Sequence, residues 1–369
     1  MVLNNITLIN FRNYNKVSID FSKNINILIG DNAQGKTNIL EAIYVLAITK
    51  SHRSLNDINL IKDGKDFCKL KGKIKTNDIS RNLEFFLSNK EKKVSINSKQ
   101  IRRLTDYISN FNIILFTPDD LELIKGSPGL RRKFLNVEIG QLDNNYLNIL
   151  NDYNRLLKTR NEYLKINIKK KNLNDDYLNV LTDKMIEKAI YIYKKRFEFI
   201  KELNKYVKSI YYDVTKNGDL YIKYIHNLNI NEFDVNKVKK ILYDKYKQNL
   251  EKEKILGITL FGPHKDDMMF KLNNNDIKIY GSQGQQRSCI LSIKLSEINI
   301  FKDKTGENPI VLLDDVFSEL DDMKKNNLIK YFNDDIQIVI TTTDLNQIKE
   351  ELLDGSFIYK ITNGNIERQ

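Results

Sequence analysis

The stretch "ILIGDNAQGKTNI", from Ile27 to Ile39, decides the fold of this chain. An apolar run leads directly into Gly30, and apolar residues at helical spacing follow Lys36. Glycine, four residues and then Gly-Lys-Thr, between a predicted strand and a predicted helix, is the pattern of a phosphate-binding loop. The backbone N–H groups of such a loop surround phosphate oxygens, and the helix N-terminus adds the positive end of its dipole. The sequence therefore predicts an α/β nucleotide-binding fold.

The loop and the first helical turn suit a nucleoside triphosphate with Mg²⁺. Lys36 is expected to reach the β- and γ-phosphates, and the hydroxyl of Thr37 is expected to ligate Mg²⁺. We therefore predict ATP and Mg²⁺ as cofactors. The predicted ATP contacts in the loop are Gly30, Asp31, Asn32, Ala33, Gln34, Gly35, Lys36 and Thr37.

A second motif, "PIVLLDDVFSELDD" from Pro309 to Asp322, supplies acidic partners for that loop. Asp314 ends a predicted buried strand and is expected to hold Mg²⁺ directly or through water. Asp315 is then positioned to polarise the attacking water. The alternative is a strand that ends in a solvated Asp-Asp turn, which a complete phosphate loop in the same chain disfavours. The predicted catalytic residues are Lys36, Asp314 and Asp315.

Composition and charge restrict the possible partners. With 369 residues, of which 41% are hydrophobic, the chain is long enough for two or three globular domains. The two cysteines, Cys68 and Cys289, are too few for a disulfide framework or a cysteine-based zinc site. A net charge of +12 favours an anionic partner, nucleic acid first. Because neither a long apolar run nor a signal pattern occurs, we expect a cytoplasmic protein without a membrane partner.

Three segments of the chain differ in pattern. Residues 1–120 have the pattern of strands with one strong helix, residues 121–255 that of helices, and the sheet pattern returns in residues 256–369. We therefore expect one α/β unit built from both ends of the chain, with a helical insertion between them. Residues 151–254 carry 24 Lys and Arg against 15 Asp and Glu, which favours a DNA-binding surface. The alternatives are a solvated helical face and a lysine excess that follows from AT-rich coding.

A third motif, "GSQGQQRSCILSIKLSE" from Gly281 to Glu297, begins with a second glycine-bearing loop before a predicted helix. It resembles the signature motif of ABC-type ATPases. In that superfamily the loop caps the γ-phosphate bound to the opposite protomer, so the resemblance implies a homodimer with two ATP molecules at its interface. The alternative is an ordinary helix N-cap. The residues expected to act in trans are Ser282, Gln283, Gly284 and Gln285.

Further segments, in order along nearly the whole chain, resemble the RecF family, in the SMC-like branch of ABC-type ATPases. The segments are "NFRNY" (10–14), "KSHR" (50–53), "TPDDLELIKGSPGLRRKFLN" (117–136), "LFGPHKDD" (260–267) and "LLDDVFSELD" (312–321), besides the phosphate and signature loops. The resemblance implies an ABC-type ATPase head, with a mixed sheet and an antiparallel β subdomain, plus a helical second lobe. It also implies ATP-dependent dimerisation on single- and double-stranded DNA at gaps, slow ATP hydrolysis, action with RecO and RecR in loading RecA, and a link to the SOS response.

Single residues follow from the same resemblance. It implies that Arg12 lies near the base or phosphates of the nucleotide, and that the segment from Ser318 to Asp321 is the D-loop at the dimer interface. The switch histidine of many ABC-type ATPases has no counterpart after "IVITTT", and no clear glutamine loop is present near "FTPDD". For His264 and Lys265, a family-typical role and a plain polar turn remain equally open.

Other classes fit the sequence less well. A transporter ATPase does not need a basic helical lobe between its nucleotide motifs. A long coiled-coil ATPase needs hundreds of heptad residues or a Cys-x-x-Cys hook between its half-heads. A DNA-binding protein without enzymatic activity does not need Lys36, Asp314 and Ser282 together, and a metabolic kinase lacks the signature loop. We therefore predict a compact ATPase that clamps DNA.

Overall fold

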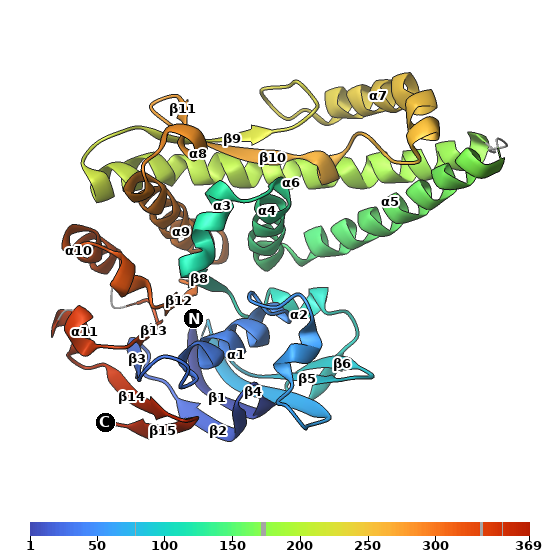
Figure 1. Cartoon of the computed structure of the whole chain (residues 1–369). Helices are drawn as coiled ribbons and strands as arrows, with labels where there is room; N and C mark the ends of the chain where they lie inside the picture. The colour runs from blue at the N-terminus through green and yellow to red at the C-terminus, as the bar shows by residue number, and fades with distance from the viewer. Residues whose placement is uncertain (78, 171–174, 333–334, 349) are drawn as a thin grey trace. The chain divides into compact units, whose positions relative to one another are not determined.

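The computed structural model describes residues 1–77, 79–170, 175–332, 335–348 and 350–369. Its contacts divide the chain into two units (Figure 1). Unit 1 consists of Met1–Leu121, Tyr206–Asp219 and Ser282–Gln369, and unit 2 of Glu122–Lys205 and Leu220–Gly281. The chain therefore forms unit 1 mainly from its two ends, as the sequence predicts.

A six-stranded sheet in the order β15-β14-β3-β13-β12-β8 forms the centre of unit 1. The five strands from β14 to β8 are parallel, and β15 is an antiparallel edge strand. Strands buried on both faces have nearly continuous apolar sequences, which explains runs such as Ile310–Leu313. The strands are β3 (Ile25–Ile29), β8 (Ile113–Phe116), β12 (Ile310–Asp314), β13 (Ile338–Thr342), β14 (Phe357–Thr362) and β15 (Asn365–Arg368).

An antiparallel sheet in the order β2-β1-β4-β5-β6-β7 is the second layer of unit 1. Helix α1 (Lys36–Ile48) contacts strands of both sheets, and most of its residues are buried. A helix between two sheets needs apolar residues around its circumference, so α1 lacks the polar face of a surface helix. The strands are β1 (Val2–Phe11), β2 (Tyr14–Asp20), β4 (Phe67–Thr76), β5 (Ile79–Ser88), β6 (Lys92–Ile96) and β7 (Lys99–Ile101).

Helix α9 (Gln283–Thr305) contacts β8 in unit 1, and most of its residues are buried. The C-terminal part of α6 (Asp175–Thr215) also belongs to this unit, since Asp213 accepts a hydrogen bond from Tyr331 and Tyr206 donates one to Asp303. The remaining helices of unit 1 are α2 (Thr105–Ile108), α10 (Asp322–Tyr331) and α11 (Glu350–Leu353), with short 3-10 turns η1 (Asp57–Leu60), η2 (Pro118–Leu121), η4 (Val316–Glu319) and η5 (Leu345–Gln347).

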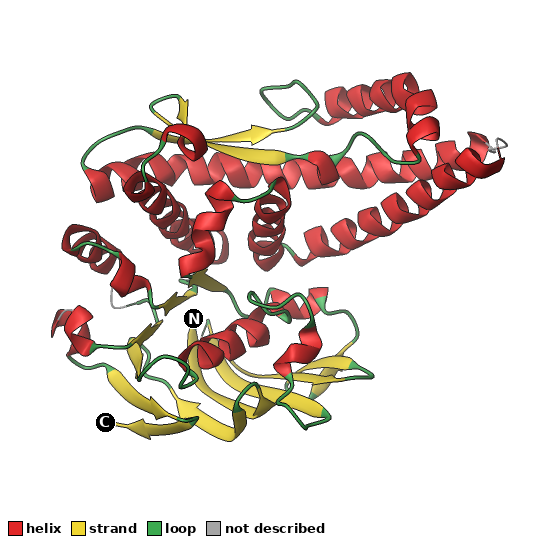
Figure 2. Cartoon of the chain, in the orientation of Figure 1, coloured by secondary structure: helices red, strands yellow, loops and turns green. Residues whose placement is uncertain are grey.

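Unit 2 is largely helical and carries a short sheet in the order β11-β10-β9 (Figure 2). Its longest element, α6, is a single helix of 41 residues. The elements are α3 (Glu122–Lys125), α4 (Pro128–Leu142), α5 (Asn144–Lys170), α6 (Asp175–Thr215), β9 (Leu220–Ile225), α7 (Val235–Leu256), η3 (Pro263–Lys265), β10 (Asp267–Leu272), β11 (Asn275–Asp276) and α8 (Ile277–Tyr280).

Buried ion pairs hold unit 2 together. Arg160 and Glu253 are both fully buried and lie 2.6 Å apart, and Arg196 lies 3.0 Å from Asp266. Tyr224 also donates a hydrogen bond to Asp266. Removing one member of such a pair leaves a buried charge without a partner, which costs about 3–5 kcal/mol.

The C-terminal boundary of the helical lobe differs from the expected one. Residues 256–281 were expected to belong to the α/β head, but they group with unit 2. The physical reason is strand pairing, because β10 is hydrogen-bonded antiparallel to β9, from Leu272↔Leu220 to Asp267↔Ile225. β9 (Leu220–Ile225) lies inside residues 121–255, the segment whose sequence has a helical pattern.

Candidate nucleotide site

Two positions in the loop between β3 and α1 accept only glycine. At Gly30 a Cβ atom would collide with the carbonyl oxygen of Ile361. Gly35 has a φ of +115°, and a Cβ there would lie 2.6 Å from the Tyr14 hydroxyl and from Asn13 Nδ2. Glycine tolerates both conditions because it lacks a side chain. The glycines of the motif are thus required by the fold of this loop.

Neighbouring turns fix the loop in place. The Tyr14 hydroxyl, at the start of β2, donates to the Gly35 carbonyl at 3.1 Å. In the turn between β14 and β15, the N–H of Asn363 donates to Gln34 Oε1 at 2.5 Å and that of Gly364 to the Gln34 carbonyl at 3.3 Å. The C-terminal hairpin, far away in sequence, therefore helps to shape the phosphate loop (Figure 1).

Lys36 is folded back onto this loop. Its side chain is 7% exposed, and Nζ donates to the carbonyls of Gly30 at 2.5 Å and Asp31 at 2.8 Å. Burial lowers the pKa of Lys36, while the charges of Asp315 and Asp314 oppose that shift. The ammonium group is thus held at the centre of the loop by carbonyl oxygens and flanked by two carboxylates.

Three side chains join the loop to the central sheet through Asp314. Thr37 Oγ1 donates to Asp314 Oδ1 at 2.9 Å, and Thr341 Oγ1 donates to the same oxygen at 2.8 Å. Burial raises the pKa of Asp314, and these two hydrogen bonds oppose the shift. Thr341 belongs to no sequence motif, and the pairing of β12 with β13 places it directly beside Asp314.

Asp315 carries an unused acceptor at this site. It has a left-handed backbone with φ of 51°, and its N–H donates to Thr341 Oγ1 at 2.9 Å. Its Oδ1 atom is buried and has no hydrogen-bond partner within the described part of the chain. A buried acceptor without a partner is costly and often marks a site completed by a ligand or water. The structure thus brings the three predicted catalytic residues together.

Arg12 is close to the site but turned toward Glu41 on α1. Its Nε and Nη2 donate to Glu41 Oε2 at 2.8 Å and Oε1 at 2.6 Å, and Nη1 donates to the Asn59 carbonyl at 2.7 Å. The implied contact of Arg12 with the nucleotide stays a prediction. Glu41 was missed by the sequence analysis, although a carboxylate within an apolar helix is an identifiable signal.

The signature loop begins helix α9 and faces solvent. Ser282 is the N-cap: its Oγ accepts from the N–H of Gln285 at 3.2 Å, and its own N–H donates to Gln285 Oε1 at 2.8 Å. A helix N-cap is therefore present, and it is compatible with a second role in trans. Within the described chain, these residues make no hydrogen bond to the phosphate loop. The exposed residues are Ser282, Gln283, Gly284 and Gln285.

The predicted D-loop residues have local partners. Ser318 Oγ donates to the carbonyl of Asp315 at 2.7 Å, and Asp321 caps α10 by accepting from the N–H of Lys324 at 2.9 Å. Both side chains are exposed. Where the switch histidine was sought, Thr343 is exposed and Asp344 caps η5. Their roles between protomers remain predictions.

His264 and Lys265 of unit 2 lie in different surroundings. His264 Nδ1 is 2.7 Å from the Tyr153 hydroxyl, Nε2 is 3.2 Å from the Thr259 carbonyl, and burial lowers the pKa of His264 to about 4. Lys265 is exposed. The histidine therefore has a structural role in this turn.

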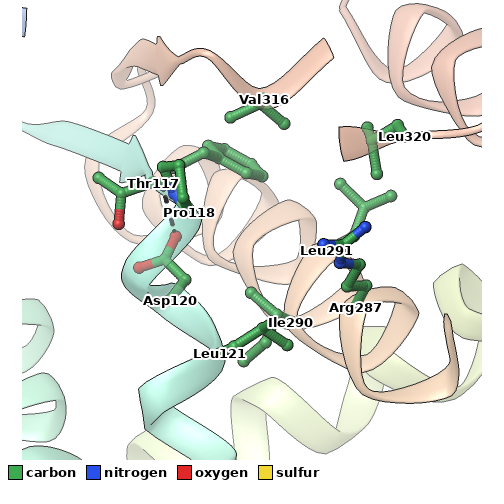
Figure 3. Close-up of a pocket in the computed structure, with 10 residues that line it drawn as sticks. Thr117, Pro118, Asp120, Leu121, Arg287, Ile290, Leu291, Val316 and Leu320 are labelled. Atoms are coloured by element: carbon green, nitrogen blue, oxygen red, sulfur yellow. Dashed lines mark hydrogen bonds between the residues drawn. The ribbon is translucent and has the colours of Figure 1, made fainter. Parts of the chain in front are cut away.

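A small cavity lies beside the acidic motif (Figure 3). Its volume is about 50 Å³, and Asp120 Oδ2 at its edge accepts a hydrogen bond from the N–H of Thr117 at 2.8 Å. Ligand pockets usually measure several hundred Å³, so this cavity does not hold a nucleotide. The lining residues are Phe116, Thr117, Pro118, Asp120, Leu121, Arg287, Ile290, Leu291, Val316 and Leu320.

The residues present fit a nucleotide with Mg²⁺. Among the described residues, no group of three or more His, Cys, Asp or Glu side chains is arranged to hold a metal ion. Mg²⁺ does not need one, because it is commonly bound by one or two protein ligands together with phosphate oxygens and water. Thr37, Asp314 and the open acceptor of Asp315 supply that donor set.

Comparison with known proteins decides the family. The model of the RecF/RecN/SMC N-terminal domain matches residues 2–365. The chain belongs to the RecF family. The protein described as "DNA replication and repair protein RecF" from Halalkalibacterium halodurans is 42% identical over all of both chains, and that from Ligilactobacillus salivarius is 41% identical over 100% of this chain and 98% of its own.

Solved structures of relatives agree with this assignment. A RecF described as the recombination mediator of the RecFOR pathway, solved with ATP, has a TM-score of 0.92 at 31% identity and covers 100% of this chain and 97% of its own. An Smc head bound to the C-terminal winged-helix domain of ScpA, at 13% identity over 100% of this chain and 97% of its own, has a TM-score of 0.56 and shares the fold. The predicted fold, an ABC-type ATPase head with a helical lobe, is thus confirmed. Among the described residues, no helix is both long and apolar enough to cross a membrane.

Proposed function

We propose that this chain is an ATP-dependent DNA-binding protein of recombinational repair and replication, and that slow ATP hydrolysis acts as its switch. The observation that carries the proposal is the convergence of Lys36, Thr37, Asp314 and the open acceptor of Asp315 on one loop. Membership of a family of DNA replication and repair proteins, with a relative solved with ATP, supports it.

Each side chain of the site has a separate role in binding or hydrolysing ATP. Lys36 would exchange its loop carbonyls for phosphate oxygens. Thr37 and Asp314 would hold Mg²⁺, which would neutralise charge on the phosphates. Asp315 accepts a hydrogen bond from the attacking water and orients it, with the N–H of Asp315 fixed by Thr341. The half-buried Asp314 is kept in place by its two threonine donors.

The signature loop acts on the nucleotide of a second copy. Ser282 and Gly284 are exposed, and a Cβ on Gly284 would meet only Ser282 Oγ, at 3.9 Å, so its surroundings are open enough for a phosphate to approach. The N-terminus of the 23-residue helix α9 favours an anion at this point. Two copies related by a two-fold axis then enclose two ATP molecules. Ser318 and Asp321 face the same interface in this proposal.

Unit 2 supplies the DNA surface. Lys184 and Lys201 on α6 are exposed and Lys188 is half-buried, and within the described residues they make no ion pair. Arg131, also in unit 2, is buried and its Nε lies 2.5 Å from Asp267 Oδ1, which disfavours a phosphate contact there. Phosphate contacts of lysines give structure-selective binding rather than base recognition.

The partners follow from family membership. We infer that the chain acts in the cytoplasm with RecO and RecR to load RecA at single-strand gaps, on both single- and double-stranded DNA, as part of the response to DNA damage. The relative described within the RecFOR pathway supports this inference.

Light scattering after size exclusion tests the proposal, with and without ATP and gapped DNA. We expect a monomer-to-dimer shift with ATP that Ser282→Arg abolishes while the monomer still binds ATP. Gln100→Arg, at an exposed position of β7, is the control with the same added charge and should dimerise normally. Normal dimerisation of Ser282→Arg would reject the arrangement in trans.

A further inference from the structure

Helix α1 carries a buried carboxylate close behind the phosphate loop. Glu41 is fully buried, and its neighbours Leu40 and Ala42 are buried apolar residues. Burial of a charge in such surroundings is unfavourable unless partners compensate it. The partners of Glu41 therefore indicate what the residue is for.

Three side chains converge on Glu41. Arg12 binds it with two hydrogen bonds, Ser51 Oγ donates to Oε1 at 2.6 Å, and Arg53 Nη1 lies 3.7 Å from Oε2. Burial raises the pKa of Glu41, but the hydrogen bonds from Arg12 and Ser51 and the charge of Arg53 outweigh it and lower the pKa overall. One carboxylate, charged at neutral pH, thus faces two guanidinium groups.

The two arginines are held differently. Arg12 is 20% exposed and donates to Glu41 and to the Asn59 carbonyl, so most of its N–H groups are occupied. Arg53 is 44% exposed and donates to Asn38 Oδ1 at 3.0 Å, next to Thr37, while its contact with Glu41 is long. Arg12 is therefore fixed, and Arg53 has donors left for an anion.

The charge of Arg53 already acts on Asp314. Burial raises the pKa of Asp314, the residue hydrogen-bonded to Thr37, and the charge of Arg53 opposes that rise. One carboxylate between two guanidinium groups also leaves one positive charge uncompensated beside the phosphate loop. A triphosphate is the anion that fits this position.

We propose that Glu41 is a positioning residue that holds Arg12 in a structural role and orients Arg53 toward the triphosphate. This inference rests on the proposed ATP site. It also replaces Arg12 by Arg53 as the arginine that contacts phosphate, because Arg12 is committed to Glu41. Glu41 itself touches no substrate and acts through Arg53.

A double-mutant cycle on ATP affinity tests this coupling. Glu41→Gln, Arg53→Gln and the double variant are compared by equilibrium titration with a fluorescent ATP analogue, with melting temperature as a measure of folding. Arg53→Gln is expected to raise the Kd about tenfold, as for the removal of one charge-assisted hydrogen bond. Glu41→Gln is expected to raise the Kd about fivefold in the wild-type background and not at all in the Arg53→Gln background, because neighbouring residues that act through each other are not additive.

Two further variants, Arg12→Gln and Ser51→Ala, complete the test. Adding Arg12→Gln to Glu41→Gln should leave the Kd for the analogue within about twofold of the Glu41→Gln value. A further tenfold rise would show that Arg12 contacts the nucleotide and would overturn the proposal. Additive effects of Glu41→Gln and Arg53→Gln would overturn it as well. If Glu41→Gln fails to fold, Ser51→Ala removes one hydrogen bond from the same carboxylate and takes its place in the cycle. Failure of the wild type to bind the analogue would refute the proposed function, whereas binding with an additive cycle would refute only this inference.

Discussion

At the scale of the residue, Asp315 is the side chain on which hydrolysis depends most directly. We predict that Asp315→Asn lowers the rate of ATP hydrolysis by about 10² to 10⁴ fold, the usual contribution of a general base. ATP affinity should change by less than about threefold, since Lys36 and the backbone of the phosphate loop make the contacts with phosphate. Phosphate release and nucleotide titration measure the two effects. Asp119→Asn, the same change at an exposed position of η2, is the control; undiminished hydrolysis by Asp315→Asn would remove this residue from the chemistry.

The sequence predicted residues of motifs better than residues of the fold. Lys36, Thr37 and Asp314 are found from spacing because a phosphate site needs them in a fixed local order. Thr341 and Glu41 belong to no spacing rule. Thr341 acts because β13 pairs with β12 in a register that places it beside Asp314, and Glu41 acts because the turns carrying its arginines fold over α1.

At the scale of the element, the loop before α1 depends on its second glycine. Gly35→Ala puts a Cβ where φ is +115° and where the Tyr14 hydroxyl lies 2.6 Å away. We predict a loss of stability of about 1–3 kcal/mol together with loss of ATP binding. Gly284→Ala, in the first turn of α9 with open surroundings, should keep the melting temperature of the wild type or raise it. Calorimetry compares the two, and equal behaviour would contradict the geometry described for the loop.

The turn that contains His264 gives unit 2 a pH dependence. Burial lowers the pKa of His264 to about 4, whereas an unfolded histidine titrates near 6.5. The unfolded state therefore binds the proton more tightly, and stability falls as pH falls from about 6.5 to about 4. Asp266 opposes this effect, since burial raises its pKa to about 6 and its protonation favours the folded state over the same range.

A substitution separates the two groups. His264→Gln removes the contribution of the histidine to the pH dependence of stability. Between pH 7 and pH 4, the unfolding free energy of the wild type should therefore fall by about 2–3 kcal/mol relative to that of the variant. Denaturant unfolding at a series of pH values measures it. A difference that stays constant with pH would show that His264 does not titrate as described.

Strands with a simple apolar pattern were predictable, and strands that depend on a partner were not. Runs such as Ile310–Leu313 are buried on both faces, so their pattern is visible in the sequence. In β9, Leu220, Ile222 and Tyr224 alternate with exposed or half-buried residues, but the segment is short and lies between long helices. Its pairing with β10 is what moves residues 256–281 into unit 2, and no local pattern reports such pairing.

At the scale of the whole molecule, DNA affinity should depend on salt through unit 2. Replacing Lys184, Lys188 and Lys201 together by Gln should reduce the slope of log affinity against log salt by about 2 to 3, near 0.9 for each phosphate that the protein no longer neutralises. Replacing three exposed lysines of unit 1 is the matched control and should leave the slope unchanged. The control positions are Lys65, Lys90 and Lys99. An unaltered slope in the unit 2 variant would place the DNA surface elsewhere.

Mixing two inactive variants tests most directly whether each ATP site is shared by two copies of the chain. Lys36→Ala lacks the phosphate lysine, and Ser282→Arg lacks a working signature loop. In a mixed dimer, one site combines the intact Lys36 of one protomer with the intact Ser282 of the other. We expect phosphate release, absent from either variant alone, to reappear in the mixture. If the mixture remains as inactive as its components while both variants fold and form mixed dimers, each chain completes its own site and the shared arrangement is contradicted.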